Sequence, residues 1–255
     1  MRATLFAIAI CVVTKSDHIE LELIATFDGL ANGGSVESCH YDASKDVWRF
    51  MNLAEQGEVC TLPGSYPSST TFEEGVQDPS INGTGSMVRG IQFVANGDVG
   101  DRLYIADADT GDVLIYDIAL EDVIGFIETG PPGTNGLCYD ADNDVLYATN
   151  VGFNPFNYSI DVGRAAIYKI SDVSSDSRSV SEIAVTPVVD QDGVQLNETN
   201  AIYIAALGPD RVFMPNGCDV MDGKVYFAES RTKDNRGGLG VYDVDTDDFY
   251  VNTRV

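Results

Sequence analysis

Basic residues are scarce in this chain, whose 255 residues include 15 Lys and Arg against 40 Asp and Glu. The formal net charge at neutral pH is therefore -25. Nucleic acids and anionic membrane surfaces are negative as well, so both would repel the chain. The charge balance excludes them as expected partners, and it suits a soluble extracellular protein or one that meets cations.

Histidine and cysteine are also few. The two histidines are His18 and His40, and no G-x-S-x-G motif is present, so a serine-hydrolase triad has no support. The five cysteines include no C-x-x-C pair, which argues against a zinc site and against a thioredoxin-type redox motif.

Three of the cysteines recur in a repeated unit described below. Cys39, Cys138 and Cys218 fall at nearly the same place in that unit. This recurrence predicts a small apolar side chain on an inner strand. A disulfide between Cys39 and Cys60 is left open.

The chain lacks an apolar run long enough to span a bilayer, which takes about 20 residues. The longest candidate, residues 3–13, follows Arg2 and has the pattern of a secretory signal peptide. We therefore expect residues 1–16 to be a leader and the protein to be secreted, although a buried first strand would give the same pattern. Three glycosylation sequons, at Asn82, Asn157 and Asn197, are compatible with a secreted glycoprotein.

Convincing amphipathic helices of ten or more residues are also lacking, and a strand repeat takes their place. Four segments share one order of strand, polar loop and aromatic-aliphatic strand, and they begin at Glu37, Arg89, Asn135 and Asn216. The first two spacings, 52 and 46 residues, match the ~40–50-residue period of propeller blades. Short strands at regular spacing with Gly-, Asp- and Asn-rich turns predict an all-β propeller.

The predicted propeller domain covers residues 17–255. Its expected blades lie approximately at 20–62, 85–120, 123–171 and 181–250. Four blades suggest either an unusual four-bladed ring or an incomplete copy of a larger ring, and we favour the second interpretation because a closed ring removes exposed strand edges.

The blade starts resemble those of a known family. "ESCHYD" keeps a Glu and an Asp as Glu37 and Asp42, and Asn135-Gly136 and Asn216-Gly217 open two later blades. In this the chain is similar to the calcium-dependent six-bladed propellers, which comprise regucalcin (senescence marker protein) and the gluconolactonases, with squid-type diisopropyl fluorophosphatase and the paraoxonases as relatives. The resemblance implies a six-bladed β-propeller, of which this chain carries about four blades.

Equivalent positions on successive inner strands converge on one axis of a propeller. Glu37, Asn135 and Asn216 would therefore face one another, and their hard oxygen donors suit Ca²⁺ or another divalent cation. The simpler interpretation is that Asn-Gly makes turns. The family implies a further ligand, an Asp on a later blade that often acts as base or nucleophile. The sequence ends before such a blade, so no catalytic residue is assigned.

The resemblance implies a secreted, calcium-dependent hydrolase of lactones or related esters, with a small-molecule lactone or ester as its substrate. The cation would polarise the carbonyl oxygen while a carboxylate activates water. The alternative is a non-catalytic secreted propeller, a binding or scaffold module with a structural calcium ion.

Overall fold

The computed structural model describes residues 7–12, 20–26, 36–42, 46–52, 58–63, 88–95, 100–120, 122–154, 159–160, 165–175, 177–185, 215–229, 238–246 and 248–252. Within these ranges every regular element is a β-strand, and every strand pairing is antiparallel. The expected all-β class is therefore confirmed.

Four sheets, here called blades 1 to 4, make up most of the fold. Blade 1 contains β3 (Val36–Asp42), β4 (Val47–Asn52) and β5 (Glu58–Pro63). Blade 2 contains β6 (Val88–Val94), β7 (Arg102–Asp107), β8 (Asp112–Asp117) and β9 (Asp122–Glu128). Blade 3 contains β10 (Thr134–Asp140), β11 (Val145–Asn150), β14 (Ala166–Ser171) and β15 (Ser179–Val185). Blade 4 contains β16 (Pro215–Met221), β17 (Lys224–Glu229), β18 (Gly238–Asp243) and β19 (Asp248–Asn252).

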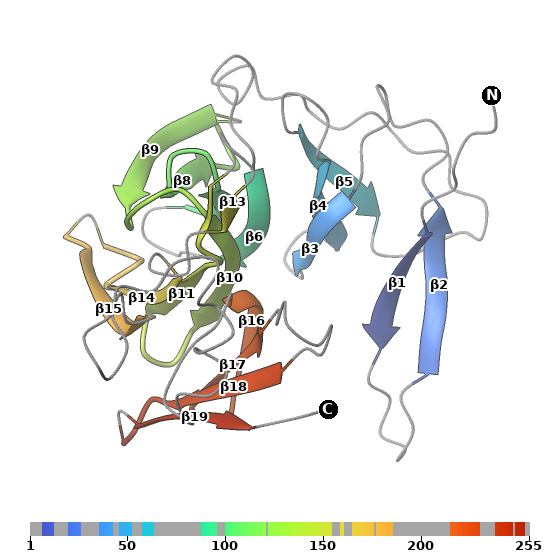
Figure 1. Cartoon of the computed structure of the whole chain (residues 1–255). Coiled ribbons are helices and arrows are strands. Elements are labelled where there is room, and N and C mark those ends of the chain that lie inside the picture. Colours follow the sequence, from blue (N-terminus) through green and yellow to red (C-terminus); the bar gives the residue numbers. More distant parts are fainter. Residues whose placement is uncertain are drawn as a thin grey trace.

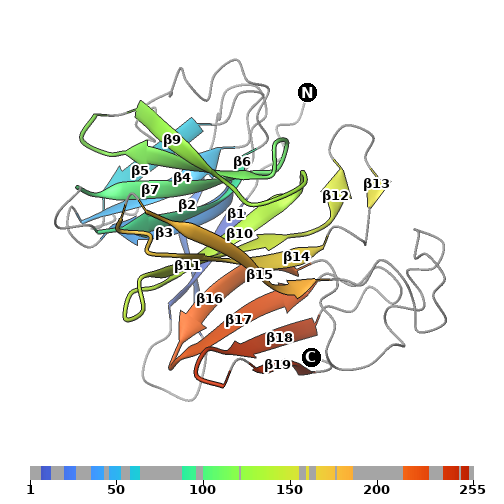
Figure 2. The ribbon, with the colours of Figure 1, turned by 90° about the vertical axis from the view of Figure 1, so that its left-hand side faces the viewer.

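The blades follow one another as an arc, from blue through green and yellow to red in Figure 1. Their first strands lie side by side: β6 contacts β3 and β10, and β10 contacts β16. Figure 2 shows blades 2, 3 and 4 one below another, with β19 at the outer edge of blade 4. The first strand of each blade therefore forms the inner surface of the arc.

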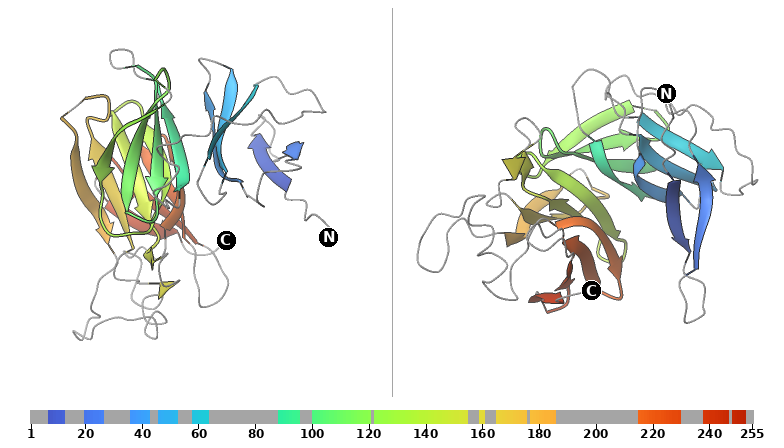
Figure 3. Two further views of the ribbon diagram at one scale, coloured as in Figure 1. Left: turned by 90° about the horizontal axis from the view of Figure 1, so that it is seen from above. Right: turned by 45° about the vertical axis from the view of Figure 1, so that its right-hand side comes forward.

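Two small hairpins complete the described strands. β1 (Ala7–Val12) pairs with β2 (Glu20–Thr26), and β12 (Phe153–Asn154) pairs with β13 (Ser159–Ile160). The β1–β2 hairpin lies on the side of blade 1 that faces away from blade 2 (Figures 1 and 3). The leader predicted over residues 1–16 is not tested by this pairing and stays a prediction.

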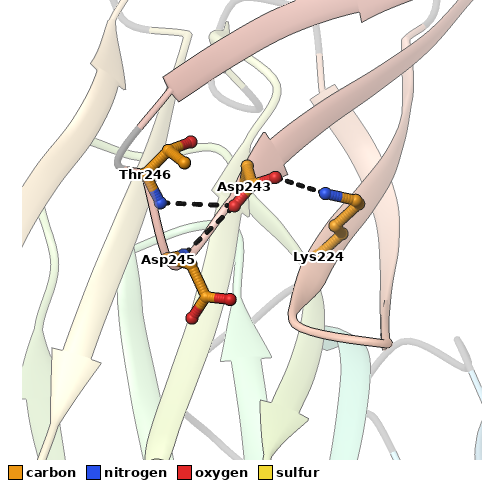
Figure 4. Close-up of polar contacts among 4 residues, drawn as sticks. All are labelled: Lys224, Asp243, Asp245 and Thr246. Atoms are coloured by element: carbon orange, nitrogen blue, oxygen red, sulfur yellow. Dashed lines mark hydrogen bonds and ion pairs between the residues drawn. The ribbon is translucent and has the colours of Figure 1, made fainter.

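Aspartates end four of these strands by the same contact. Asp107, Asp117, Asp140 and Asp243 each use Oδ1 to accept hydrogen bonds from the backbone N–H groups two and three residues later. Figure 4 shows this turn at Asp243, where Lys224 also donates to the second carboxylate oxygen. Aspartate favours such turns because its short side chain reaches its own backbone. These acidic loops are thus hairpin turns.

The core lies between blades. All six residues of β7 and of β11 are buried. Blades 2 and 4 cover the two faces of β11. One apolar cluster joins blades 2 and 3 around Tyr104 and Leu146, and another joins blades 3 and 4 around Tyr147 and Phe227. Tyr104 and Tyr147, aromatic residues of the second strands β7 and β11, thus pack between blades.

The second strands of blades 1 and 4 carry the aromatic residues Trp48 and Tyr226. Tyr226 is only half-buried, and the side chain of Trp48 lies outside the described part of the chain.

The outermost strands belong to other blades than the sequence suggested. The predicted bounds put Asp122–Glu128 in the third blade and Ser179–Val185 in the fourth, but these strands pair with β8 and β14 and so close blades 2 and 3. Glu20–Thr26, predicted within the first blade, pairs with β1. An outer strand packs on one neighbour only, so its sequence pattern does not say which sheet it joins.

The expected role of the inner-strand cysteines was wrong for Cys138 and Cys218. Cys138 and Cys218, expected to be separate apolar side chains, form a disulfide between β10 and β16 with a Cα–Cα distance of 5.6 Å. The open pairing of Cys39 with Cys60 does not fit the register, because both residues pair with Phe50 from opposite sides. Two strand spacings separate them by about 9–10 Å, beyond the ~7 Å limit for a bridge.

Candidate functional site

The inner strands share one irregularity at the same place in all four blades. Between the first and fourth residues of β3, β6, β10 and β16, the register to the second strand shifts, so two residues face one. Such a β-bulge bends the strand and frees backbone groups, and bulges recur next to functional sites. The paired residues in the four bulges are Glu37-Ser38, Arg89-Gly90, Asn135-Gly136 and Asn216-Gly217. We call these four dipeptides the bulge ring.

Glycine lets neighbouring bulges approach backbone to backbone. A Cβ on Gly90 would lie 2.3 Å from the carbonyl oxygen of Asn135, and a Cβ on Gly136 would lie 2.3 Å from that of Asn216. Any side chain at Gly90 or Gly136 would therefore push two blades apart. Gly90 and Gly136 thus allow the close contact between neighbouring blades, while Asn135 and Asn216 supply the carbonyl oxygens that they meet.

Thr149 links the bulges of blades 3 and 4. Its fully buried Oγ1 accepts the Gly136 N–H at 2.8 Å and donates to the carbonyl oxygen of Asn216. The bulge takes the Gly136 N–H out of the ladder, so a buried donor would otherwise lack an acceptor. Thr149 satisfies that donor and fixes Asn135 relative to Asn216.

The connection from blade 2 to blade 3 fixes the start of β10. The hydroxyls of Thr129 and Thr134 both donate to the carbonyl oxygen of Gly111, and both side chains are buried. Asn150 donates its amide to the Pro131 carbonyl oxygen at 2.7 Å. Because these buried polar groups are mutually satisfied, they hold one backbone position. Asn135 therefore follows a rigid segment.

The three predicted metal ligands occupy equivalent bulge positions. Glu37, Asn135 and Asn216 are each the second residue of an inner strand, and the backbones of Asn135 and Asn216 lie on adjoining strands. Both asparagine side chains are half-buried. The side chain of Glu37 lies outside the described part of the chain, so a common metal centre stays a prediction.

Arg89 is the fourth member of this set and changes its electrostatics. It is the second residue of β6, between the strands that carry Glu37 and Asn135. The two amides are neutral, so the formal charges of the four residues, one positive on Arg89 and one negative on Glu37, sum to zero. Calcium affinity rises with the negative charge of the ligands. The oxygen donors suit a hard cation, but the charge of this set does not fit a tight calcium site.

In the described ranges, no three His, Cys, Asp or Glu side chains come together in a way that could hold a metal ion. No helix there is long and apolar enough to cross a membrane. The three sequons at Asn82, Asn157 and Asn197 fall outside the described residues.

Thr149 was missed at the sequence level, although a signal existed. It stands opposite the bulge of blade 3, and the corresponding residues of the other blades are Met51, Ala106 and Ala228. A threonine at a position that is otherwise apolar indicates a specific hydrogen bond. Recognising it requires the exact register of the two strands, which the repeat alone does not give.

Comparisons with known proteins bear on the fold. Neither a protein-family model nor a curated protein matches this sequence. Solved structures do match, among them a chain of the crystal structure of a nidogen/laminin complex. That chain has a TM-score of 0.50 and 12% sequence identity, with 96% of this chain and 90% of that chain covered. At this identity the likeness shows the fold alone, an antiparallel all-β architecture consistent with a β-propeller.

Proposed function

We propose that this chain is a non-catalytic binding or scaffold module of the β-propeller type. The observation that carries the proposal is the composition of the bulge ring. Its positions in blades 2, 3 and 4 join neighbouring blades through glycine contacts and Thr149, and the formal charges of Arg89 and Glu37 sum to zero. Residues that hold blades together and carry no excess negative charge suit a rigid platform better than an open metal centre.

The cross-links between blades support a platform role. The disulfide between Cys138 and Cys218 joins blades 3 and 4, and the hydroxyl of Tyr104 in blade 2 donates to the carbonyl oxygen of Val173 in blade 3 at 2.9 Å. Preorganised surfaces bind partners at a lower entropic cost.

Secretion belongs to the same proposal. Disulfides persist mainly in oxidising compartments such as the extracellular space. Expression in a eukaryotic secretory system, followed by sequencing of the amino terminus and enzymatic removal of N-glycans, would test the leader and the three sequons together.

We also propose that the fold is a β-propeller of the six-bladed type, of which the structure describes four blades. The resemblance of the blade starts to the calcium-dependent propellers supports it, together with the recurrence of one bulge in all four inner strands.

A calcium-dependent hydrolase of lactones or esters is the second candidate. One observation favours it: Asn135 and Asn216, both predicted ligands, lie at adjoining bulges. In that case the amide oxygens of Asn135 and Asn216 with the carboxylate of Glu37 would hold the ion, which would supply Lewis-acid chemistry.

One experiment separates the two candidates. The purified chain is assayed on gluconolactone and on an aryl ester, with calcium and with a chelator. The platform proposal expects hydrolysis at the uncatalysed rate under both conditions. Calcium-dependent turnover that is lost in Glu37→Gln would overturn it in favour of the hydrolase.

A further inference from the structure

The outer strand of blade 2 carries an exposed apolar patch. Leu120 is 68% exposed, Ile124 45% and Phe126 60%, and all three lie in or directly before β9. β9 is the last strand of its sheet, at the outer edge of blade 2 in Figures 1 and 2. Among the side chains described in the outer strand of blade 3, Val180 is the one large apolar side chain that is exposed, at 39%. Exposed apolar patches of this kind mark interaction sites on soluble proteins.

Acidic residues stand at both ends of this patch as like-charge pairs. Asp117 pairs with Asp122 at one end of the β8–β9 ladder, and Asp112 pairs with Glu128 at the other. Like charges directly opposite each other destabilise a sheet. Burial raises the pKa of Asp112, and the charges of Asp107 and Glu128 raise it further against a hydrogen bond with Thr110 that lowers it. The strand pair therefore carries an electrostatic cost that a cation beside it would relieve.

Arg102 pairs with Asp117 across the β7–β8 ladder but is buried, so it does not present its charge at the surface of β9. Residues 103–163 hold eleven Asp and Glu and no Lys, Arg or His. A second copy of the chain would bring the same carboxylates to the contact and a net charge of -25. Charge complementarity thus selects a basic partner and opposes self-association.

The bulge in β9 disfavours backbone pairing with another strand, so a partner would contact this edge through side chains. Tyr116 pairs with Val123 and Ile115 with Gly125, so Ile124 is an extra residue that forms a bulge. Bulges on edge strands hinder the addition of another strand. The exposed aromatic ring of Phe126, with Ile124 and Leu120, is then the apolar centre, and the acidic pairs are the rim. Interfaces commonly have this arrangement.

We propose that the outer edge of blade 2 is a docking surface for a protein segment in which apolar side chains are flanked by Lys or Arg. The surface consists of Leu120, Ile124 and Phe126 with the rim of Asp112, Asp117, Asp122 and Glu128. This inference rests on the proposed function as a binding module and gives that module a partner chemistry.

The test uses the full chain and a fluorescein-labelled peptide, KKLFLKK, with fluorescence anisotropy as the readout. KKSSSKK and EELFLEE are the control peptides. We expect KKLFLKK alone to bind, Ile124→Ser/Phe126→Ser to weaken binding at least about tenfold, and Asp122→Asn/Glu128→Gln to weaken it and reduce its salt dependence. The matched control, Val180→Ser on β15, should bind as the wild type does. Thermal unfolding checks that each variant is folded.

Three results would overturn the inference. These are no binding of KKLFLKK, equal binding by the Ile124→Ser/Phe126→Ser variant, or a dimer in light scattering that this variant dissociates, since a second copy would then be the occupant. Each leaves the module proposal standing, because that proposal fails only through calcium-dependent turnover in the hydrolysis assay.

Discussion

Single atoms decide how close the blades can come. At Gly136 the space for a side chain is filled by the carbonyl oxygen of Asn216 and by the Cα of Gly217, whose distances from an added Cβ are 2.3 and 2.8 Å. Gly217 sits at the same bulge position of the next blade, yet nothing lies within 4 Å of an added Cβ there. A side chain in place of glycine is therefore tolerated at Gly217 but not at Gly136.

Gly136→Ala should lower the free energy of unfolding by about 1–3 kcal/mol, the usual cost of overpacking. Gly217→Ala should leave it nearly unchanged. Urea unfolding of both variants followed by circular dichroism measures the difference. Equal stability of the two variants would mean that the bulges of blades 3 and 4 do not touch as described.

Arg89 offers a second test at the level of one residue. Two unit charges about 8 Å apart interact by roughly 2 kcal/mol at a protein surface, which is more than a tenfold change in affinity. Arg89→Met should therefore raise calcium affinity at least about tenfold, as titration calorimetry or terbium luminescence would detect.

The control for Arg89→Met is Lys224→Met, which removes the same charge at the ion pair with Asp243 in blade 4. If both variants bind calcium as the wild type does, the bulge ring does not act as a cation site.

Among the elements, the turn after β10 is tied to the turn after β14. The carboxylate of Asp144 accepts hydrogen bonds from the backbone and hydroxyl of Ser174 and from the hydroxyl of Tyr139. Partial burial alone would raise the pKa of Asp144, but these hydrogen bonds and the charge of Arg178 outweigh it and lower the pKa. The ionised form of Asp144 therefore links two hairpins of blade 3.

The sign of the pH effect follows from the lowered pKa. A carboxyl with a lower pKa in the folded state contributes stability that is present above its unfolded pKa, about 3.9, and is lost as pH falls through the folded pKa. Asp144→Asn should reduce stability at pH 7 and flatten its decline below about pH 4. Thermal melts from pH 7 to acid measure this.

The control is Asp142→Asn, which removes a carboxylate from the same turn and leaves the contacts of Asp144 with Ser174 and Tyr139 in place. Identical acid limbs for the wild type and Asp144→Asn would show that this link contributes nothing to the pH dependence.

The strands that are buried on both faces could be predicted from the sequence. The alternating aromatic and aliphatic residues of β7 and β11 follow from burial between blades, and they were predicted. In β9 the pattern is exposed, half-buried and exposed in turn, with a bulge at Ile124. Such a strand has few buried side chains, so its residues do not specify the sheet, which explains why β9 was assigned to blade 3 in place of blade 2.

The disulfide between Cys138 and Cys218 could not be predicted from the sequence for a geometric reason. Cys138 is the fifth residue of β10, whereas Cys218 is the fourth residue of β16. Aligned repeats suggest that such cysteines stack as equivalent side chains on separate strands. Only the sideways contact of β10 with β16 brings their Cα atoms to 5.6 Å. The same holds for the candidate site: the repeat predicts Asn135 and Asn216, but the contact of Thr149 depends on how neighbouring strands pair.

For the whole molecule, the contact between blades 3 and 4 is both apolar and covalent. Removing the bridge in Cys138→Ala/Cys218→Ala should lower the free energy of unfolding by about 2–4 kcal/mol. Dithiothreitol should lower wild-type stability by a similar amount and leave the double variant unchanged, as urea unfolding would show. Cys39→Ala serves as the control. A wild-type transition that does not respond to the reductant would contradict the bridge.

The same bridge also determines how the molecule responds to tension. A force applied to the two chain ends passes through the sulfur atoms and bypasses the segment between Cys138 and Cys218, which are 80 residues apart in sequence. At about 3.4 Å per extended residue, roughly 270 Å of contour length stays out of reach of the pulling force. Blade 3 beyond its inner strand is thus mechanically shielded, and only chemical reduction makes that length extensible.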